Sequence, residues 1–184
     1  MLYRKEFSFE SLDKTRIYDI TPQINETIAE TRTEAGLAVV RLGHTTVRVI
    51  MTELETNLVG DILATSVELI GEDPRGTWVN GQDYPGRKFP YRHYCMDNPR
   101  RRPGQIDEDY NAGRHIRAIV FGQASVTIPY IDCNLELGQF EQVGLIECDG
   151  RNGSGVNPIR ERSFQVWVQP DKVFDLPSEK ITFD

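Results

Sequence analysis

Cysteine and histidine are scarce in this chain, which has three of each in 184 residues. The cysteines, Cys95, Cys133 and Cys148, lie far apart and form no CxxC pair, so neither a disulfide framework nor a zinc ribbon is indicated. No stretch approaches the ~18 consecutive apolar residues of a membrane span. Residues 1–11 alternate polar and apolar side chains and lack the apolar segment of a signal peptide. We therefore expect a reduced, cytoplasmic protein that does not bind membranes.

Basic residues are also outnumbered, because 21 Lys and Arg against 28 Asp and Glu give a formal charge of −7. A surface of this sign argues against binding to nucleic acid or to an anionic membrane. The charge is uneven, since residues 87–102 carry +5 and the remainder of the chain −12. Two interpretations of this basic segment stay open: it binds phosphate groups, or it is a solvated loop that offsets the acidic remainder.

The composition is that of one globular domain, with 39% hydrophobic and 27% charged residues. A chain of this length buries a sufficient core without disulfides or metals. Periodicity disappears between residues 71 and 109, which predicts an inserted basic loop. Residues 171–184 are polar and predict a C-terminal tail. We therefore treat residues 1–184 as a single domain with one insertion.

Hydrophobic periodicity predicts the elements on either side of this loop. Strands are expected at 2–11, 15–20, 37–42, 46–51, 124–131, 140–148 and 163–169, with a short one at 135–137, and helices at 21–35, 53–70 and 111–121. The first two strands are close enough in sequence to form a hairpin. The first helix has Thr21 as its N-cap and ends at Gly36. Residues Thr52 to Glu55 fit a capping box at the start of the second helix. The order ββαββααβββ favours an α+β fold, a mainly antiparallel sheet with about three helices on one face.

Each histidine lies where a site residue would. His44 joins two predicted strands, His93 lies in the basic loop, and His115 lies on the third helix. HxH and HExxH are absent, so no two histidines share a local ligand motif. A single imidazole in such a place is more often structural, whereas three neutral imidazoles brought together by folding would suit Zn²⁺ or a similar metal.

Acidic and basic residues cluster where the last predicted strands meet. Glu147, Asp149 and Arg151 lead into a glycine-rich loop, and Arg160 and Arg162 follow it. Such ends are typical of sites for anionic or metal-chelated ligands, and also of ordinary turns. The arginines are suited to bidentate phosphate binding. No Walker A, GxGxxG or GxSxG motif occurs. A Cys–His nucleophile through Cys148 or Cys95 stays open, although the apolar strand around Cys148 is more typical of an inert core thiol.

Together these segments resemble the YjbQ-like family, known as a secondary thiamine-phosphate synthase family. The resemblance covers about residues 5–168. Its motifs, in order, are Tyr18-Asp19-Ile20-Thr21, Gly43-His44-Thr45-Thr46 with Glu53 and Asp61, Tyr91-Arg92-His93, Asn111-Ala112-Gly113-Arg114-His115, Ser125-Val126-Thr127-Ile128-Pro129, Leu137-Gly138-Gln139 and Glu147-Cys148-Asp149-Gly150-Arg151. Two departures stand out. Residues 98–106 look inserted, and Asp149-Gly150-Arg151 replaces the usual Asp-Gly-Pro-Arg turn.

The resemblance implies an α+β homotrimer with a cleft near subunit boundaries. It also implies a reaction that joins a hydroxymethylpyrimidine diphosphate to a thiazole phosphate and releases pyrophosphate. On this basis the expected catalytic residues are His44, Glu147 and Asp149, and the expected ligands of a divalent metal such as zinc are His44, His93 and His115. The residues expected to bind the phosphorylated substrate are Thr45, Asn111, Arg151, Arg160 and Arg162. The alternative is a metal- or anion-binding homotrimer with a regulatory or other role.

Overall fold

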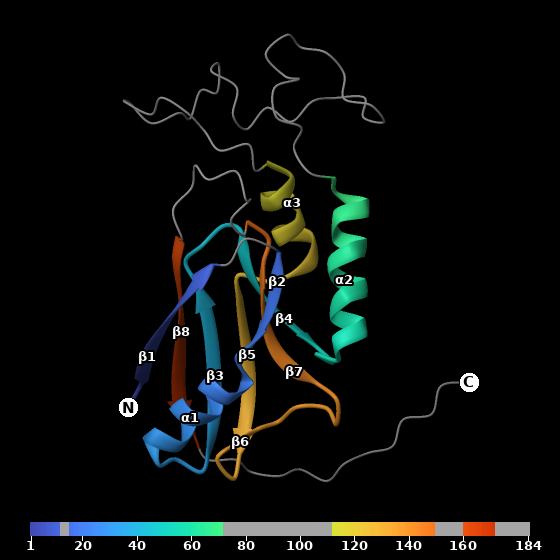
Figure 1. Cartoon of the computed structure of the whole chain (residues 1–184). Coiled ribbons are helices and arrows are strands. Elements are labelled where there is room, and N and C mark those ends of the chain that lie inside the picture. Colours follow the sequence, from blue (N-terminus) through green and yellow to red (C-terminus); the bar gives the residue numbers. More distant parts are fainter. Residues whose placement is uncertain (12–14, 72–111, 150–159, 172–184) are drawn as a thin grey trace, which may run out of the picture.

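The computed structural model describes residues 1–11, 15–71, 112–149 and 160–171. In chain order the elements are β1 (Tyr3–Ser11), β2 (Arg16–Asp19), α1 (Thr21–Thr31), β3 (Ala35–Leu42), β4 (Val47–Thr52), α2 (Thr56–Leu69), α3 (Ala112–Phe121), β5 (Ser125–Ile131), β6 (Asn134–Leu135), β7 (Gln142–Glu147) and β8 (Arg160–Pro170). The α+β class with antiparallel strands and three helices is confirmed (Figure 1). The predicted loop at 71–109 and tail at 171–184 fall almost wholly outside the described residues.

Two antiparallel sheets form the body of the molecule. The larger has the strand order β1-β8-β3-β5-β6, and the smaller has the order β2-β7-β4. One hydrophobic cluster joins them, because buried residues of both sheets belong to it, among them Val40 and Val166 of the larger sheet and Val143 of the smaller. The strands alternate buried and exposed residues, as half-buried strands do.

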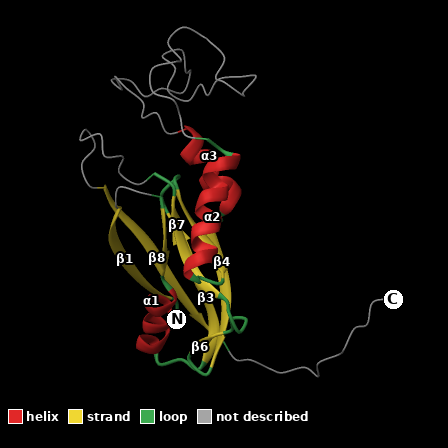
Figure 2. Ribbon diagram, turned by 45° about the vertical axis from the view of Figure 1, so that its right-hand side comes forward, coloured by secondary structure: helices red, strands yellow, loops and turns green. Residues whose placement is uncertain are grey.

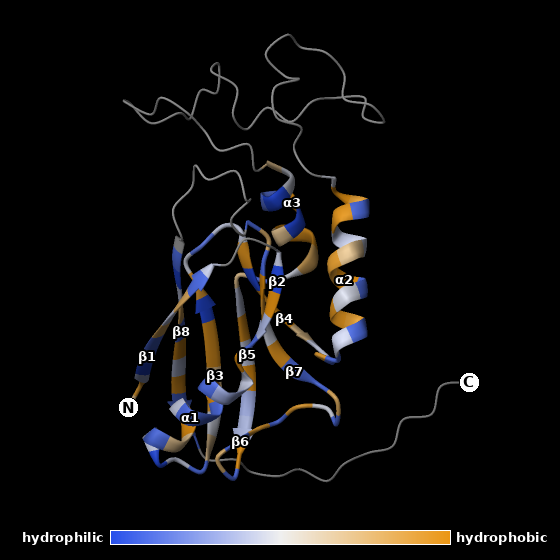
Figure 3. Cartoon of the chain, in the orientation of Figure 1, coloured by the Kyte–Doolittle hydropathy of each residue, from blue (hydrophilic) through white to orange (hydrophobic). Residues whose placement is uncertain are grey.

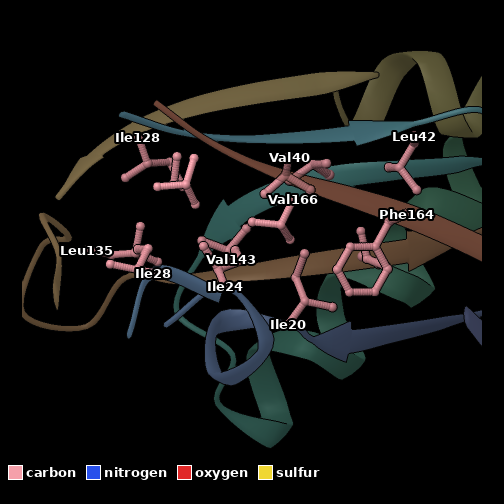
Figure 4. Packing of buried hydrophobic residues seen from close by; sticks show 14 of the residues in the cluster. Ile20, Ile24, Ile28, Val40, Leu42, Ile128, Leu135, Val143, Phe164 and Val166 are labelled. Atoms are coloured by element: carbon pink, nitrogen blue, oxygen red, sulfur yellow. The ribbon is translucent and has the colours of Figure 1, made fainter. Parts of the chain in front are cut away.

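Helix α1 completes this core. Ile24 and Ile28, four residues apart on one face of the helix, are both fully buried in the cluster (Figure 4). The other helices pack elsewhere. Ala118 of α3 lies in a second, smaller cluster with Ile146 and Cys148. The helices therefore divide between the two clusters, instead of covering one common face.

The predicted hairpin between the first two strands is wrong. β1 pairs with β8 of the larger sheet, whereas β2 pairs with β7 of the smaller sheet. β1 alternates half-buried and exposed residues, whereas in β2 only the two central residues are half-buried, and each strand pairs within a different sheet. The chain therefore passes from the larger to the smaller sheet between β1 and β2. The short separation of the two strands in the sequence does not mean that they pair with each other.

The ends of α1 also differ from the prediction. Thr21 is its first residue instead of its N-cap, which is Ile20, and the Oγ1 of Thr21 accepts a hydrogen bond from the backbone N–H of Val143. The helix ends at Thr31, and Arg32 takes the left-handed conformation with φ 55°. Gly36 lies in β3, with φ +155°, where a Cβ would collide with the carbonyl oxygen of Gln169. The glycine is therefore required by close strand packing, not by a helix end.

Helix α2 starts three residues later than predicted and is largely exposed. Its N-cap is Glu55, whose carboxylate accepts hydrogen bonds from the backbone N–H groups of Asn57 and Leu58. The helix lies next to α3 (Figure 2). Ser66 is its one buried residue, although the helix is rich in apolar residues (Figure 3). None of the helices in the described part of the chain combines the length and apolar character needed to cross a membrane.

Candidate functional site

β3 and β7 end, and β8 begins, at the end of the molecule where the first turn of α3 lies (Figure 1). Six polar side chains of this region are linked by hydrogen bonds and ion pairs to one another or to the neighbouring backbone. We call this group the polar end cluster; its members are His44, Thr46, Arg114, Glu147, Asp149 and Arg162. The backbone of the β3–β4 connection is tied to the end of β7, because the N–H of Cys148 donates to the carbonyl of Thr46. Residues far apart in the sequence thereby meet at one end of the two sheets.

A buried ion pair forms the centre of the polar end cluster. Glu147 is fully buried at the end of β7, and its Oε2 accepts a 2.9 Å hydrogen bond from Nε of Arg162. Its Oε1 accepts a second hydrogen bond, from the backbone N–H of Asp149 at 2.8 Å. Both oxygens of the carboxylate are thus engaged. Such a pair fixes its partners firmly, because removing one charge leaves the other buried and uncompensated.

Arg162 keeps hydrogen-bonding capacity beyond this pair. Its Nη2 donates to Oγ1 of Thr46 at 3.3 Å, and the side chain is 10% exposed. A guanidinium has five N–H groups. Two are therefore used, and the other three have no acceptor among the residues that the structure describes. Arg162 is therefore a nearly buried cation, held in place by Glu147 and Thr46, with N–H groups that remain available to a ligand.

His44 is held by the backbone of β8. The last β3–β8 pair is Leu42 with Phe164, and beyond it the N–H of Ser163 donates to Nε2 of His44 at 3.0 Å. The imidazole thus accepts a hydrogen bond from β8 just beyond the point where β3 stops pairing with that strand. Burial lowers the pKa of His44, the positive charge of Arg162 lowers it further, and the negative charge of Glu147 opposes both. His44 is therefore neutral near pH 7.

A second ion pair connects α3 to the end of β7. Nη1 of Arg114 lies 2.5 Å from Oδ1 of Asp149, and their side chains are 11% and 4% exposed. With Arg162 and Glu147, the polar end cluster thus holds two guanidinium groups and two carboxylates. Its formal charge is zero when His44 is neutral, so it would recognise a ligand by directed hydrogen bonds more than by net charge.

The structure brings four of the predicted site residues together: His44, Glu147, Asp149 and Arg162. Thr45 is exposed beside them, whereas Thr46 is buried. His115 is half-buried on α3. The backbone of Arg160 opens β8 opposite Ser11, but its side chain is not described. His93, Asn111 and Arg151 lie outside the described residues. The predicted roles of these residues stay predictions.

The three-histidine metal site also stays a prediction, because His93 is not described. Among residues 1–11, 15–71, 112–149 and 160–171, no three His, Cys, Asp or Glu side chains are placed to hold a metal ion. The imidazole of His44 already uses Nε2 to accept a hydrogen bond from the backbone N–H of Ser163. In this conformation it does not present a metal ligand through that atom.

Cys148 is not suited to act as a nucleophile. Its side chain is buried in the smaller hydrophobic cluster, and this burial raises the pKa of the thiol to about 12. The thiol therefore stays protonated at neutral pH, and the thiolate is the reactive form. The interpretation of Cys148 as a core residue is confirmed. Cys95, the other candidate, lies outside the described residues.

Three contributors to the site were missed in the sequence. Thr46 and Arg114 stand inside the family motifs, but the sequence points to their neighbours Thr45 and His115. The alternation of β4, in which Val47 and Val49 are buried, predicts an outward Thr46. The bend at residues 45–46 buries it instead, so no local pattern indicates its position. Ser163 contributes a backbone N–H, which no side-chain pattern indicates.

The family model described as "UPF0047 protein YjbQ-like" matches residues 5–170, nearly the whole chain. The chain belongs to the YjbQ-like family. Two curated relatives, both described as UPF0047 proteins, support this membership. The one from Methanothermobacter thermautotrophicus is 23% identical over 81% of this chain and 85% of its own length. The one from Archaeoglobus fulgidus is 28% identical over 79% of this chain and 90% of its own length.

Solved structures of similar proteins show the same fold. A YbjQ-like protein of unknown function from Sulfolobus solfataricus is 20% identical, covers 93% of this chain and 99% of its own, and gives a TM-score of 0.67. A hypothetical protein from Aeropyrum pernix is 22% identical, covers 92% of this chain and 99% of its own, and gives a TM-score of 0.65. These likenesses establish the YjbQ-like fold and no particular activity.

Proposed function

We propose that the polar end cluster binds the phosphate or diphosphate group of a small phosphorylated molecule. The observation that carries this proposal is Arg162, a nearly buried guanidinium with three N–H groups that have no acceptor among the described residues. No Arg162 nitrogen is among the described buried polar atoms that lack a partner, so these N–H groups are accessible to a ligand. A planar fork of donors matches the oxygens of a phosphate group, which accept but do not donate when fully ionised.

Glu147 acts as a positioning residue in this proposal. Because the side chain is fully buried and each oxygen already accepts a hydrogen bond, it has no exposed atom to take a proton from a substrate. Its carboxylate instead fixes the Nε edge of Arg162, so that the remaining edge of the guanidinium faces the ligand. We therefore favour this role over the acid–base role expected from the resemblance.

The activity we propose for this site follows from the family resemblance: coupling of a hydroxymethylpyrimidine diphosphate with a thiazole phosphate. The bond between the methylene carbon and the diphosphate oxygen breaks, pyrophosphate leaves with the electron pair, and the thiazole nitrogen forms the new bond. Negative charge accumulates on the departing diphosphate. Donors that are already oriented stabilise such charge without reorganisation, and Arg162 and His44 are held in this manner.

Two measurements on the purified protein test this function separately. Titration calorimetry with pyrophosphate tests the binding site, with sulfate and chloride as matched anions. Incubation with both substrates, followed by detection of thiamine phosphate, tests the reaction. Pyrophosphate binding together with product formation supports the enzyme. Binding without product favours the alternative, an anion-binding protein with a regulatory role, and absence of pyrophosphate binding contradicts both.

We also propose that the chain assembles as a homotrimer, as the resemblance implies, through the apolar surface of α2 and α3. An isolated 14-residue helix is only marginally stable in water, yet α2 has one buried residue. Leu69 of α2 and Ile119 and Val120 of α3 are each more than 60% exposed. A hollow of about 440 Å³ lies between α3 and the strands β4 and β5, lined in part by Ile119 and Val120. Helices α2 and α3 contact each other, and exposed apolar surface grouped in this way marks protein interfaces.

The oligomer is tested by light scattering of the wild-type protein and of two charge variants. Ile119→Glu places a carboxylate in the apolar surface, so we expect the trimer mass to fall to that of the monomer. Phe140→Glu is the matched control, because Phe140 is 64% exposed in the connection before β7, and this variant keeps the wild-type mass. A monomeric wild type, or equal masses in all three proteins, contradicts the proposed interface.

A further inference from the structure

We propose that His44 serves the bound phosphate group as a hydrogen-bond donor through Nδ1–H, and that it is not a metal ligand. This inference rests on the proposed function, because the acceptor is the phosphate group bound beside Arg162. It begins from the 3.0 Å hydrogen bond in which the backbone N–H of Ser163 donates to Nε2 of His44. A neutral imidazole that accepts at one nitrogen carries its proton on the other. The tautomer of His44 is thereby fixed with the proton on Nδ1.

The amide of Ser163 cannot be turned away from the imidazole. It belongs to β8, whose backbone pairs with β1 at Ser8 and with β3 up to Leu42. A strand fixed on both sides offers its N–H in one direction only. Loss of the acceptor would leave that N–H without a partner in a partly buried place, which native structures rarely tolerate. The backbone of β8 therefore selects the tautomer.

Metal binding through either nitrogen would break this hydrogen bond. A metal at Nε2 would occupy the lone pair that accepts from Ser163. A metal at Nδ1 of a neutral imidazole would move the ring proton to Nε2, where two N–H groups would then face each other. The structure thus disagrees with the role of His44 as one of three histidine ligands.

Nδ1 is the nitrogen that stays open to a ligand. It makes no hydrogen bond to any residue in the described part of the chain, and it is absent from the buried polar atoms there that lack a partner. The β3–β4 connection that carries His44 also carries Thr46, which contacts Arg162. The charge of Arg162 is also close enough to lower the pKa of His44, so we assign the Nδ1–H group and the open edge of the guanidinium to one site. Both are donors, so the matching ligand is an oxyanion such as a phosphate or diphosphate.

The tautomer is tested directly by nitrogen NMR of protein labelled with ¹⁵N-histidine, in which His44→Gln identifies the resonances of His44. Long-range proton–nitrogen correlations distinguish a protonated ring nitrogen from a bare one. We expect Nδ1 to be protonated and Nε2 to be bare, and pyrophosphate to shift the Nδ1–H signal. Addition of Zn²⁺ should leave the His44 pattern unchanged, and metal content should be equal in wild type and His44→Gln.

Two variants distinguish the roles of the two ring nitrogens of His44, because their side-chain amides differ in length. The side-chain amide introduced by His44→Asn places an N–H donor near the position of Nδ1, whereas that of His44→Gln reaches towards the amide of Ser163 and places no donor at Nδ1. We expect pyrophosphate affinity to fall about 10- to 100-fold in His44→Gln, the effect of one lost hydrogen bond to a charged group. His44→Asn should retain most of the affinity.

Each outcome has a distinct meaning. A protonated Nε2 in the wild-type protein, or Zn²⁺ bound through His44, overturns the inference even if both variants fail to fold. Equal pyrophosphate affinity in wild type and His44→Gln overturns the donor role. Failure of the proposed function looks different, because the wild-type protein then does not bind pyrophosphate while the NMR spectrum still shows Nδ1–H. In that case the ligand role of His44 falls with the function.

Discussion

At the scale of single residues, the site depends on buried charges that are held in ion pairs. Glu147 has no exposed surface, and its carboxylate holds Arg162 on one side and the backbone of Asp149 on the other. Burial of two charges is tolerated because each satisfies the other, and replacement of one is therefore more costly than loss of an exposed pair. The same ion pair gives the guanidinium its orientation, so stability and ligand binding depend on the same contact.

Glu147→Gln should destabilise the protein by about 3–5 kcal/mol, because it leaves the Arg162 charge buried without a counter-charge. Urea unfolding of both proteins at neutral pH measures this difference. Glu136→Gln is the matched control, since Glu136 is exposed, and it should lie within about 0.5 kcal/mol of wild type. Similar unfolding midpoints for Glu147→Gln and Glu136→Gln would show that the buried pair does not stabilise the fold.

His44 should make stability depend on pH. Its pKa is lowered in the folded protein, first by burial and then by Arg162, so the unfolded chain binds a proton at a higher pH than the folded protein does. Stability contributed by neutral His44 is therefore complete above the unfolded pKa of about 6.5 and is lost as the pH falls below it. The free energy of unfolding should decrease more between pH 7 and pH 5 in wild type than in His44→Gln. A steeper decrease in the variant would contradict the lowered pKa.

At the scale of elements, close packing and capping explain positions that local sequence patterns misplace. The sequence predicted most strands, because the alternation of β1, β3, β5 and β8 is strong enough to show which face is buried. It placed Gly36 at the end of a helix and paired β1 with β2, because contacts with Gln169 and with β8 are not visible in a local window. Pairing between distant strands is a property of the whole chain.

Gly36→Ala should lower the free energy of unfolding by about 1–3 kcal/mol, because the new Cβ would meet the backbone of Gln169 and Pro170 in β8. Urea unfolding provides the measurement. Gly43→Ala serves as the control, since no atom lies within 4 Å of the Cβ position there, and it should differ little from wild type. If the two substitutions have equal effects, the close approach of β3 and β8 at Gly36 is not a constraint.

The carboxylate of Glu55 should hold the first turn of α2. It accepts the backbone N–H groups of Asn57 and Leu58, and these hydrogen bonds lower its pKa. In Glu55→Ala we expect faster hydrogen exchange of the α2 amides, because two N–H groups lose their acceptor. Glu53→Ala removes an exposed carboxylate two residues away and should leave exchange unchanged. Equal exchange in both variants would contradict the capping role.

At the scale of the whole molecule, the two sheets and α3 assemble one site from segments that are distant in sequence. The sequence identified Glu147, Asp149 and Arg162 as candidates, because acids and arginines stand where strands end. It did not identify Thr46, Arg114 or the amide of Ser163, whose roles arise only when β3, β8 and α3 meet. The family resemblance supplied the order of the motifs, and the structure supplied the contacts between them.

The central claim is that Arg162, oriented by Glu147, binds the phosphate group of the ligand. Calorimetric titration of pyrophosphate into wild type and Arg162→Lys tests it most directly. Lysine keeps the positive charge beside Glu147 but lacks the planar fork of donors, so pyrophosphate should bind at least about tenfold more weakly. Arg4→Lys, at an exposed site in β1, should bind as wild type does. Equal pyrophosphate affinity in wild type and Arg162→Lys would contradict the account.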